Sequence, residues 1–143
     1  MPKNFLATSF IAFLSLIVIG NWSADAKTNA PEKTVSIEAV RKLVALDIGA
    51  PEDSIEIVKK GKVLTITRIN SSLNEASHQS RNEEAASIMA VVVKAIADVA
   101  EYNSLYSIAV HYTSRANASS KTSVIDTIEF RKNQKGEFEI HLT

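Results

Sequence analysis

The segment from Ser80 to Glu101 constrains the fold more than any other part of this sequence. Ser80 and Glu83 have the spacing of a capping box, in which each side chain bonds the other residue's backbone amide at a helix N-terminus. Apolar side chains then recur every three or four residues, along one side of a helix: Ala85, Ile88, Met89, Val92, Ile96 and Val99. We therefore predict a helix over 81–101 whose apolar side covers a sheet.

Residues 1–26 have the pattern of a secretory signal peptide. Lys3 supplies the positive start, an apolar run extends from Phe5 to Ile19, and Ala24-Asp25-Ala26 is a small-x-small cleavage signature. A helix of about 15 apolar residues spans about 22 Å, less than the roughly 30 Å of a hydrocarbon core. We expect cleavage after Ala26, a secreted or periplasmic location and no stable membrane span afterwards; an uncleaved anchor is the alternative.

The sequence beyond this signal has the length of one domain. We expect a flexible lead-in over 27–33 and a single domain over 34–143. The full chain has 16 basic and 16 acidic side chains, and this balance argues against nucleic acid as a partner. Cysteine is absent, so an exported chain of this kind cannot rely on disulfides, which favours a bacterial periplasm over a eukaryotic secreted domain.

Turn residues and apolar periods divide the domain into its elements. A first helix is predicted over 36–47, with Ser36 or Thr34 as N-cap and Gly49 as its left-handed C-terminal residue. Apolar residues then alternate with a period of two, which predicts strands over 54–58, 63–69, 105–113, 124–131 and 137–143. A polar loop over 114–123 and a turn over 133–136 separate the last three strands.

This order, α-β-β-α-β-β-β, predicts an α+β domain with two helices on one face of a mainly antiparallel sheet of four to five strands. The second strand can also pair in parallel with a later strand across the long helix. The helix-covered face is assigned to Tyr106, Ile108, Val110, Tyr112, Ile128, Phe130, Phe138, Ile140 and Leu142. Cross-strand charge pairs are expected on the opposite face, from Glu129, Arg131, Glu139 and His141.

The connection over 70–79 delivers polar side chains to the start of the long helix. Helix N-terminal amides and the macrodipole favour anions, so His78, Arg81 and Asn82 are the predicted ligand-binding residues. In this interpretation Arg81 pairs with a carboxylate or phosphate while His78 donates a hydrogen bond. The alternative has Ser80 capping the helix, Arg81 solvated and His78 packed on a loop.

Asp126 is a carboxylate in the apolar register of its strand. It is the fourth predicted site residue, as a base or ligand with a pKa raised by burial. A position near a strand end, or a bulge that moves the side chain towards water, is the alternative.

The common catalytic and cofactor motifs are missing, so no catalytic residue, metal or cofactor is predicted. A metal site from His111, His141 and Glu129 or Glu139 is conceivable on the open face, but no spacing requires it. The sequence favours a non-enzymatic exported binding or envelope-accessory domain, whose partner is an unknown protein or a small anionic ligand. The alternative is a small hydrolase or anionic-ligand-binding enzyme with its pocket at the N-terminus of the 81–101 helix.

Overall fold

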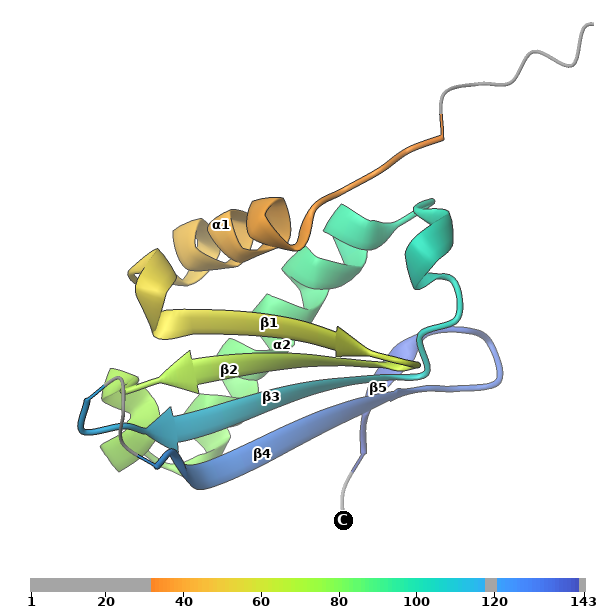
Figure 1. Ribbon diagram of the computed structural model, residues 1–143. Coiled ribbons are helices and arrows are strands. Elements are labelled where there is room, and N and C mark those ends of the chain that lie inside the picture. The colour runs from red at the N-terminus through yellow and green to blue at the C-terminus, as the bar shows by residue number, and fades with distance from the viewer. Residues whose placement is uncertain (1–31, 118–120, 142–143) are drawn as a thin grey trace, which may run out of the picture. The chain divides into compact units, whose positions relative to one another are not determined.

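Two helices pack on one face of a five-stranded sheet in the order β1-β2-β3-β4-β5, which confirms the predicted α+β class (Figure 1). The computed structural model describes residues 32–117 and 121–141. Its helices are α1 (Ile37–Ile48) and α2 (His78–Ile96), and short 3₁₀ helices are η1 (Glu52–Ser54), η2 (Ser72–Glu75) and η3 (Ala100–Tyr102). Its strands are β1 (Ile55–Lys60), β2 (Val63–Ile69), β3 (Ser107–Ser114), β4 (Ser123–Lys132) and β5 (Phe138–His141).

Three of the four strand pairs are antiparallel, and β2 pairs with β3 in parallel. The parallel pair follows from the long helix, since α2 carries the chain from the end of β2 back to the start of β3 (Figure 1). The sheet therefore contains the parallel pairing across the long helix that the sequence allowed.

The predicted signal peptide over 1–26 lies outside the described residues. The predicted lead-in over 27–33 is described at residues 32–33, where Lys33 Nζ donates to the carbonyl of Ala97 at 2.6 Å. Leu142, assigned from the sequence to the covered face, also lies outside the described residues.

Local signals place α1 within one residue of its predicted bounds. The Ser36 hydroxyl accepts a hydrogen bond from the Ala39 amide at 3.1 Å and caps the N-terminus. Gly49 ends the helix with a φ of 63°, a left-handed conformation that glycine adopts without steric cost.

The predicted bounds of the long helix are wrong at both ends. The helix begins at His78, because the Ser77 hydroxyl accepts from the Ser80 amide at 3.1 Å; Ser77 is therefore the cap, and Ser80 lies in the first turn. It ends at Ile96, since Asp98 takes a left-handed φ of 61° and the chain continues into η3. The apolar side is nevertheless as predicted, with five of its residues buried and Met89 partly buried: Ala85, Ile88, Val92, Ile96 and Val99.

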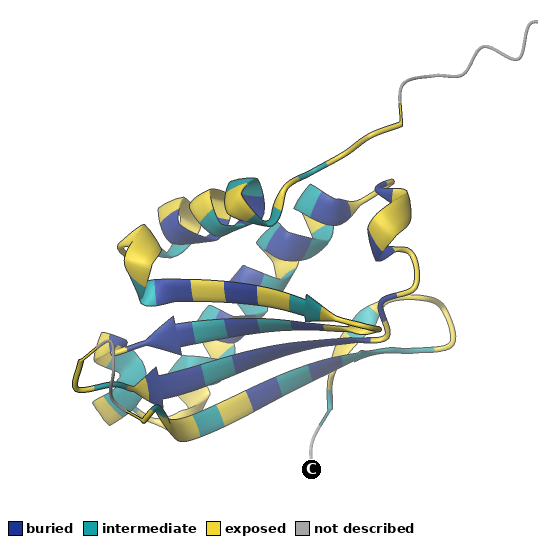
Figure 2. Cartoon of the chain, viewed as in Figure 1, coloured by how far each residue is buried: buried dark blue, intermediate teal, exposed yellow. Residues whose placement is uncertain are grey.

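The core lies between the helices and the sheet (Figure 2). Two residues assigned to it are exposed, Tyr106 at 51% and Ile140 at 43%. Tyr106 precedes the first residue of β3, and Ile140 belongs to the short edge strand β5. The central strand β3 is buried on both faces, since Ser107, Ala109 and Thr113 are also covered.

The charges on the open face follow the expected pattern only in part: Glu129 lies opposite His141, whose charge helps to lower the pKa of Glu129. Arg131 lies opposite Glu139 in the strand register, yet its ion pair, at 3.0 Å, is with Glu129 two residues earlier on the same strand. Glu139 instead accepts from Asn133 Nδ2 at 2.8 Å.

Candidate functional site

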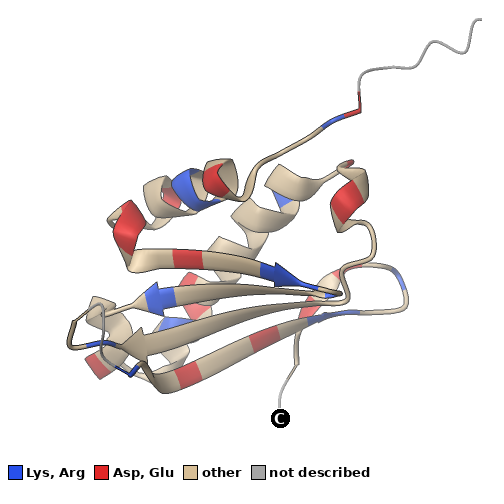
Figure 3. Ribbon diagram, viewed as in Figure 1, with Lys and Arg blue, Asp and Glu red and all other residues tan. Residues whose placement is uncertain are grey.

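A row of polar side chains crosses the helix-covered face of the sheet beneath the first turns of α2. Arg68 on β2 lies opposite Tyr112 on β3, and Tyr112 lies opposite Asp126 on β4. Arg81 and Glu84 on α2 pair with Asp126 and Arg68 respectively. Basic and acidic residues are interspersed over the rest of the described domain as well (Figure 3). The row and these two helix residues together contain two arginines and two carboxylates, so their charges cancel.

Asp126 is the centre of the first charged cluster. Its Oδ2 accepts from Arg81 Nε at 2.7 Å and lies 2.7 Å from His78 Nδ1, while its Oδ1 accepts from the Thr127 amide at 2.8 Å. Burial alone would raise the pKa of Asp126, but the hydrogen bonds from Arg81, His78 and Thr127 outweigh it and hold the pKa below its ordinary value. The expected rise in pKa is therefore wrong in direction, because the carboxylate is paired.

A register shift in the β3–β4 pairing adjoins Asp126. Tyr112 is paired with Asp126 and Thr113 with Val124, so Ile125 is the extra residue of β4 at this point. The Asp126 side chain retains 15% exposure. The predicted bulge is therefore present, yet Asp126 still bonds residues of α2.

The Arg81 side chain is mostly buried and links separate parts of the fold. Its side chain is 11% exposed, and its Nη1 donates to the carbonyls of Leu73 at 3.0 Å and Ala76 at 2.6 Å. With Nε on Asp126, this arginine connects η2 and the following residues to β4. It is thus not the solvated side chain of the alternative interpretation, and much of its hydrogen-bonding capacity is used within the protein.

The remaining predicted residues meet around a small polar cavity, which we call the His78 hollow. It has a volume of about 180 Å³ and is lined by His78, Asn82, Asp126, Thr127, Ile128, Glu129, Ile140 and His141. Arg81 lies behind Asp126 and does not line it. The structure therefore brings three of the four predicted residues to one concave surface; their role in ligand binding stays a prediction.

The two carboxylates of the His78 hollow are both held by arginines. Asp126 is bonded by Arg81, and Glu129 by Arg131, with the Ser107 hydroxyl as a further donor at 2.7 Å. Hydrogen bonds from Arg131 and Ser107 lower the pKa of Glu129. Both acids are therefore charged at neutral pH, and each has a cationic partner.

The second charged cluster, Arg68 and Glu84, is not among the residues that sequence reasoning selected. Arg68 Nε donates to Glu84 Oε1 at 3.0 Å, and Nη1 donates to the Ser54 hydroxyl at 3.0 Å. The signal was present in the sequence, because Arg68 falls in the alternation of Leu64 and Ile66. The pattern that marks Asp126 as a candidate, a charged residue in an apolar register, applies equally to Arg68.

Tyr112 lies between the two clusters. Its hydroxyl donates to the carbonyl of Arg81 at 2.9 Å. Burial, and then the neighbouring Glu84 carboxylate, raise the pKa of Tyr112. The phenol therefore stays protonated and acts as a hydrogen-bond donor below α2.

Within residues 32–117 and 121–141, no group of three or more His, Asp or Glu side chains has an arrangement that could hold a metal ion. His111 faces the open side of the sheet, and burial lowers its pKa. None of the described helices combines the length and apolar character needed to cross a membrane.

Comparison of the chain with protein-family models and with curated proteins finds no match. The two charged clusters and the cavities beside them are therefore the features from which a function can be inferred.

Proposed function

We propose that this chain is an exported, non-enzymatic binding domain that holds a small acidic group in the His78 hollow. One observation carries the proposal: His78 is fixed by Asp126 at 2.7 Å, yet 59% of its side chain is exposed at the edge of a concave surface. A side chain that is both oriented and accessible suits recognition, because little conformational freedom is lost when a ligand binds.

The electrostatics of the hollow favour an anion. Arg81 and Arg131 balance the two carboxylates of the hollow, and the imidazoles of His78 and His141 line it as groups that can donate a hydrogen bond to an anion. The positive end of the α2 dipole lies at the same place, because His78 is the first residue of the helix. A carboxylate or phosphate group is therefore the ligand class that fits best.

Asn82 supplies an uncharged donor on the same surface. It lines the hollow one helical turn after His78, and its side-chain amide has no hydrogen-bond partner within the described part of the chain. An amide in this position can donate to a ligand oxygen without first breaking a bond in the protein.

Export is supported by the residue pattern over 1–26, and the absence of cysteine suits a domain that folds without disulfides. The proposed setting is the periplasm or the extracellular medium. A partner that presents an acidic side chain and a free small anion both satisfy the chemistry of the hollow.

Nuclear magnetic resonance of the three histidines tests the proposal. Titration with acetate or phosphate is expected to shift the imidazole resonances of His78 and His141 saturably, while His111 stays unchanged as an internal reference. Asn82→Ala is expected to weaken the response, and His111→Gln to leave it intact. Equal small shifts at all three histidines would contradict a site.

A second candidate function is hydrolysis, which the Asp126–His78 pair favours. A carboxylate that accepts from Nδ1 leaves Nε2 able to take a proton from water or an alcohol. An assay with p-nitrophenyl acetate distinguishes the two functions. Turnover faster than an equal concentration of imidazole, lost in His78→Gln, would favour the enzyme; a rate no faster than imidazole is expected for the binding domain.

A further inference from the structure

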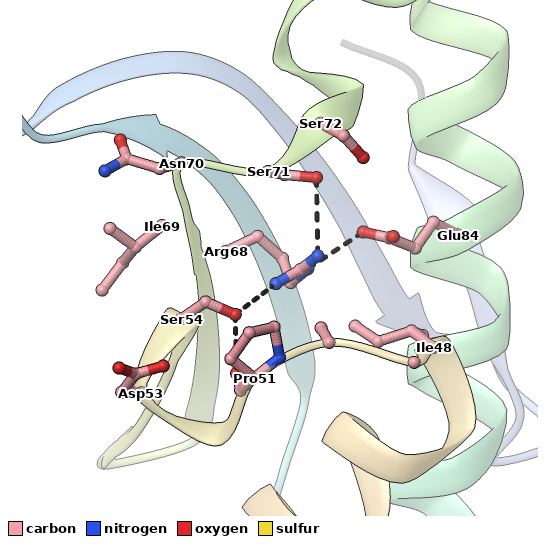
Figure 4. Close-up of a pocket in the computed structure, with 12 residues that line it drawn as sticks. Ile48, Pro51, Asp53, Ser54, Arg68, Ile69, Asn70, Ser71, Ser72 and Glu84 are labelled. Carbon is pink, nitrogen blue, oxygen red and sulfur yellow. Dashed lines mark hydrogen bonds and ion pairs between the residues drawn. The ribbon is translucent and has the colours of Figure 1, made fainter.

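A second cavity, which we call the Arg68 hollow, lies where the C-terminal end of α1, η1 and the end of β2 meet (Figure 4). Its volume is about 480 Å³. This lies within the range of about 300–1,000 Å³ that is typical of small-molecule sites. The Arg68 hollow shares no residue with the His78 hollow.

Arg68 forms the base of this cavity and is held in one position. The residue is 5% exposed, and its guanidinium is bonded by Glu84, by Ser54 and, at 3.5 Å, by the Ser71 hydroxyl (Figure 4). A guanidinium has five N–H groups, so one on Nη1 and one on Nη2 remain for a bound oxygen. The donors are therefore oriented before any ligand arrives.

Acceptors and a further donor lie beside the arginine. Glu84 is a carboxylate with capacity beyond its bond to Arg68, and it lines the same cavity. The Ser71 oxygen accepts from the Leu73 amide at 3.1 Å and from Arg68, which leaves its proton to donate. A ligand group that both accepts and donates, such as a hydroxyl, satisfies this set better than a carbonyl or an ammonium.

The charges select a neutral ligand. Arg68 and Glu84 cancel at the base, so an anion would gain no net attraction there, and the Asp53 carboxylate, which also lines the cavity, would repel it. An ammonium has no lone pair with which to accept a hydrogen bond, so it cannot use the Arg68 donors at the base of the cavity. The apolar part of the lining, from Ile48, Pro51 and Ile69, suits the C–H face of a ring.

We infer that the Arg68 hollow binds a neutral, polyhydroxylated small molecule of monosaccharide size. Arg68 and Ser71 donate to its hydroxyl oxygens, and Glu84 accepts from its hydroxyl protons. The inference goes beyond the proposed function and is independent of it, because the two cavities are separate and suit different kinds of ligand.

Titration of the full domain with a panel of sugars tests the inference. Binding is measured from the chemical shifts of the backbone amides. The neutral probes are glucose, galactose, mannose and N-acetylglucosamine, and the charged probes are glucuronate and glucosamine. At least one neutral sugar is expected to shift the amides of Gly49, Ser54, Ser71 and Ser72 saturably, with affinity at least about threefold above both charged probes. No saturable shift up to about 100 mM with any neutral sugar, or tighter binding of a charged probe, would overturn it.

Glu84→Gln tests the charge argument directly. Removing this carboxylate leaves Arg68 uncompensated, so the affinity for glucuronate relative to the best neutral sugar is expected to rise at least about tenfold. An unchanged ratio in a folded variant would overturn the inference. If Glu84→Gln does not fold, Ser71→Ala decides instead: it is expected to weaken the neutral sugar at least about threefold, whereas Asn82→Ala in the other hollow leaves it unchanged. Equal affinities in Ser71→Ala and the unsubstituted chain would then overturn it.

Discussion

Arg68 on β2 and Glu84 on α2 form an ion pair of 3.0 Å between the sheet and the helix, with only 6% and 15% of their side chains exposed. Burying such a pair costs desolvation energy, and the domain tolerates each buried charge only while its partner is present. Removing one partner leaves a buried charge alone, which is far more costly than removing both.

A double-mutant cycle tests this coupling. Arg68→Met or Glu84→Gln alone is expected to lower the free energy of unfolding by about 3–5 kcal/mol. Arg68→Met combined with Glu84→Gln is expected to cost less than the sum of the two single changes, because no uncompensated charge remains. Urea denaturation measures all three variants; strictly additive losses would show that the pair is not coupled.

Ser77, and not Ser80, is expected to be the serine whose hydroxyl stabilises the start of α2. Ser77→Ala should lower the free energy of unfolding by about 0.5–2 kcal/mol, because it removes the acceptor for the Ser80 amide. Ser80→Ala, which loses a bond between two hydroxyls at 3.0 Å, serves as the matched control and should cost less. If Ser80→Ala lowered the denaturation midpoint more than Ser77→Ala, the result would support the capping box at Ser80 and Glu83 instead.

The domain is expected to lose stability in acid through Asp126 and Glu129. Folding lowers the pKa of both carboxyls, so their contribution is present above the unfolded values of about 4 and is lost as the pH falls through the folded pKa values. Asp126→Asn should therefore reduce the difference in unfolding free energy between neutral and acidic pH. Glu75→Gln, an exposed change on η2, should leave that difference intact. The measurement is chemical denaturation at several pH values, and an Asp126→Asn profile parallel to the unsubstituted one would refute the role of the pairing.

Truncating a buried isoleucine is expected to cost far more stability than truncating an exposed one on the edge strand. Ile88→Ala should cost about 2–5 kcal/mol, because Ile88 is fully buried between α2 and the sheet. Ile140→Ala, on the edge strand β5, should stay within about 0.5 kcal/mol of the unsubstituted chain. Thermal unfolding compares them, and a large loss at Ile140 would indicate a partner covering β5.

Export predicts a mature chain that begins at Lys27. Expression of the full sequence in a bacterium, followed by intact-mass analysis of the periplasmic fraction, should find the chain without residues 1–26. Ala24→Leu and Ala26→Leu should block processing, since signal peptidase sites require small residues there. A full-length chain in the membrane fraction would indicate the uncleaved anchor.

Features of the fold that depend on neighbouring residues are predictable from the sequence, whereas features that depend on contacts between distant segments are less so. The bounds of α1 depend on a serine, a glycine and the residues between them, so the sequence is sufficient there. The start of α2 was misplaced because Ser77 and Ser80 both match a capping residue, and side-chain spacing alone cannot choose between them. The exposure of Ile140 depends on the edge position of β5, which alternation along one strand does not report.

The candidate site was partly predictable for the same reason. Asp126 and His78 were singled out separately, one as a carboxylate in an apolar register and the other as a polar group at a helix start. Their 2.7 Å contact depends on the order and register of β3 and β4, which no local pattern contains. Arg68 has the same local signal as Asp126, a charged residue in an apolar register, but its pairing with Glu84 on α2 likewise depends on long-range packing.

The strand pairs of the domain differ in how much chain entropy their formation costs, and the parallel pair of β2 and β3 costs the most. The other adjacent strands are joined by short connections and can pair as hairpins. In contrast, the 37 residues 70–106 separate β2 from β3, so closing this pair has a larger entropic cost. An αββα half and a three-stranded meander thus meet along one seam, whose seven residue pairs run from Val63–Ser107 to Ile69–Thr113. We therefore expect this parallel pairing to form more slowly than the hairpins, and a chain cut between α2 and β3 tests whether the two fragments reassociate.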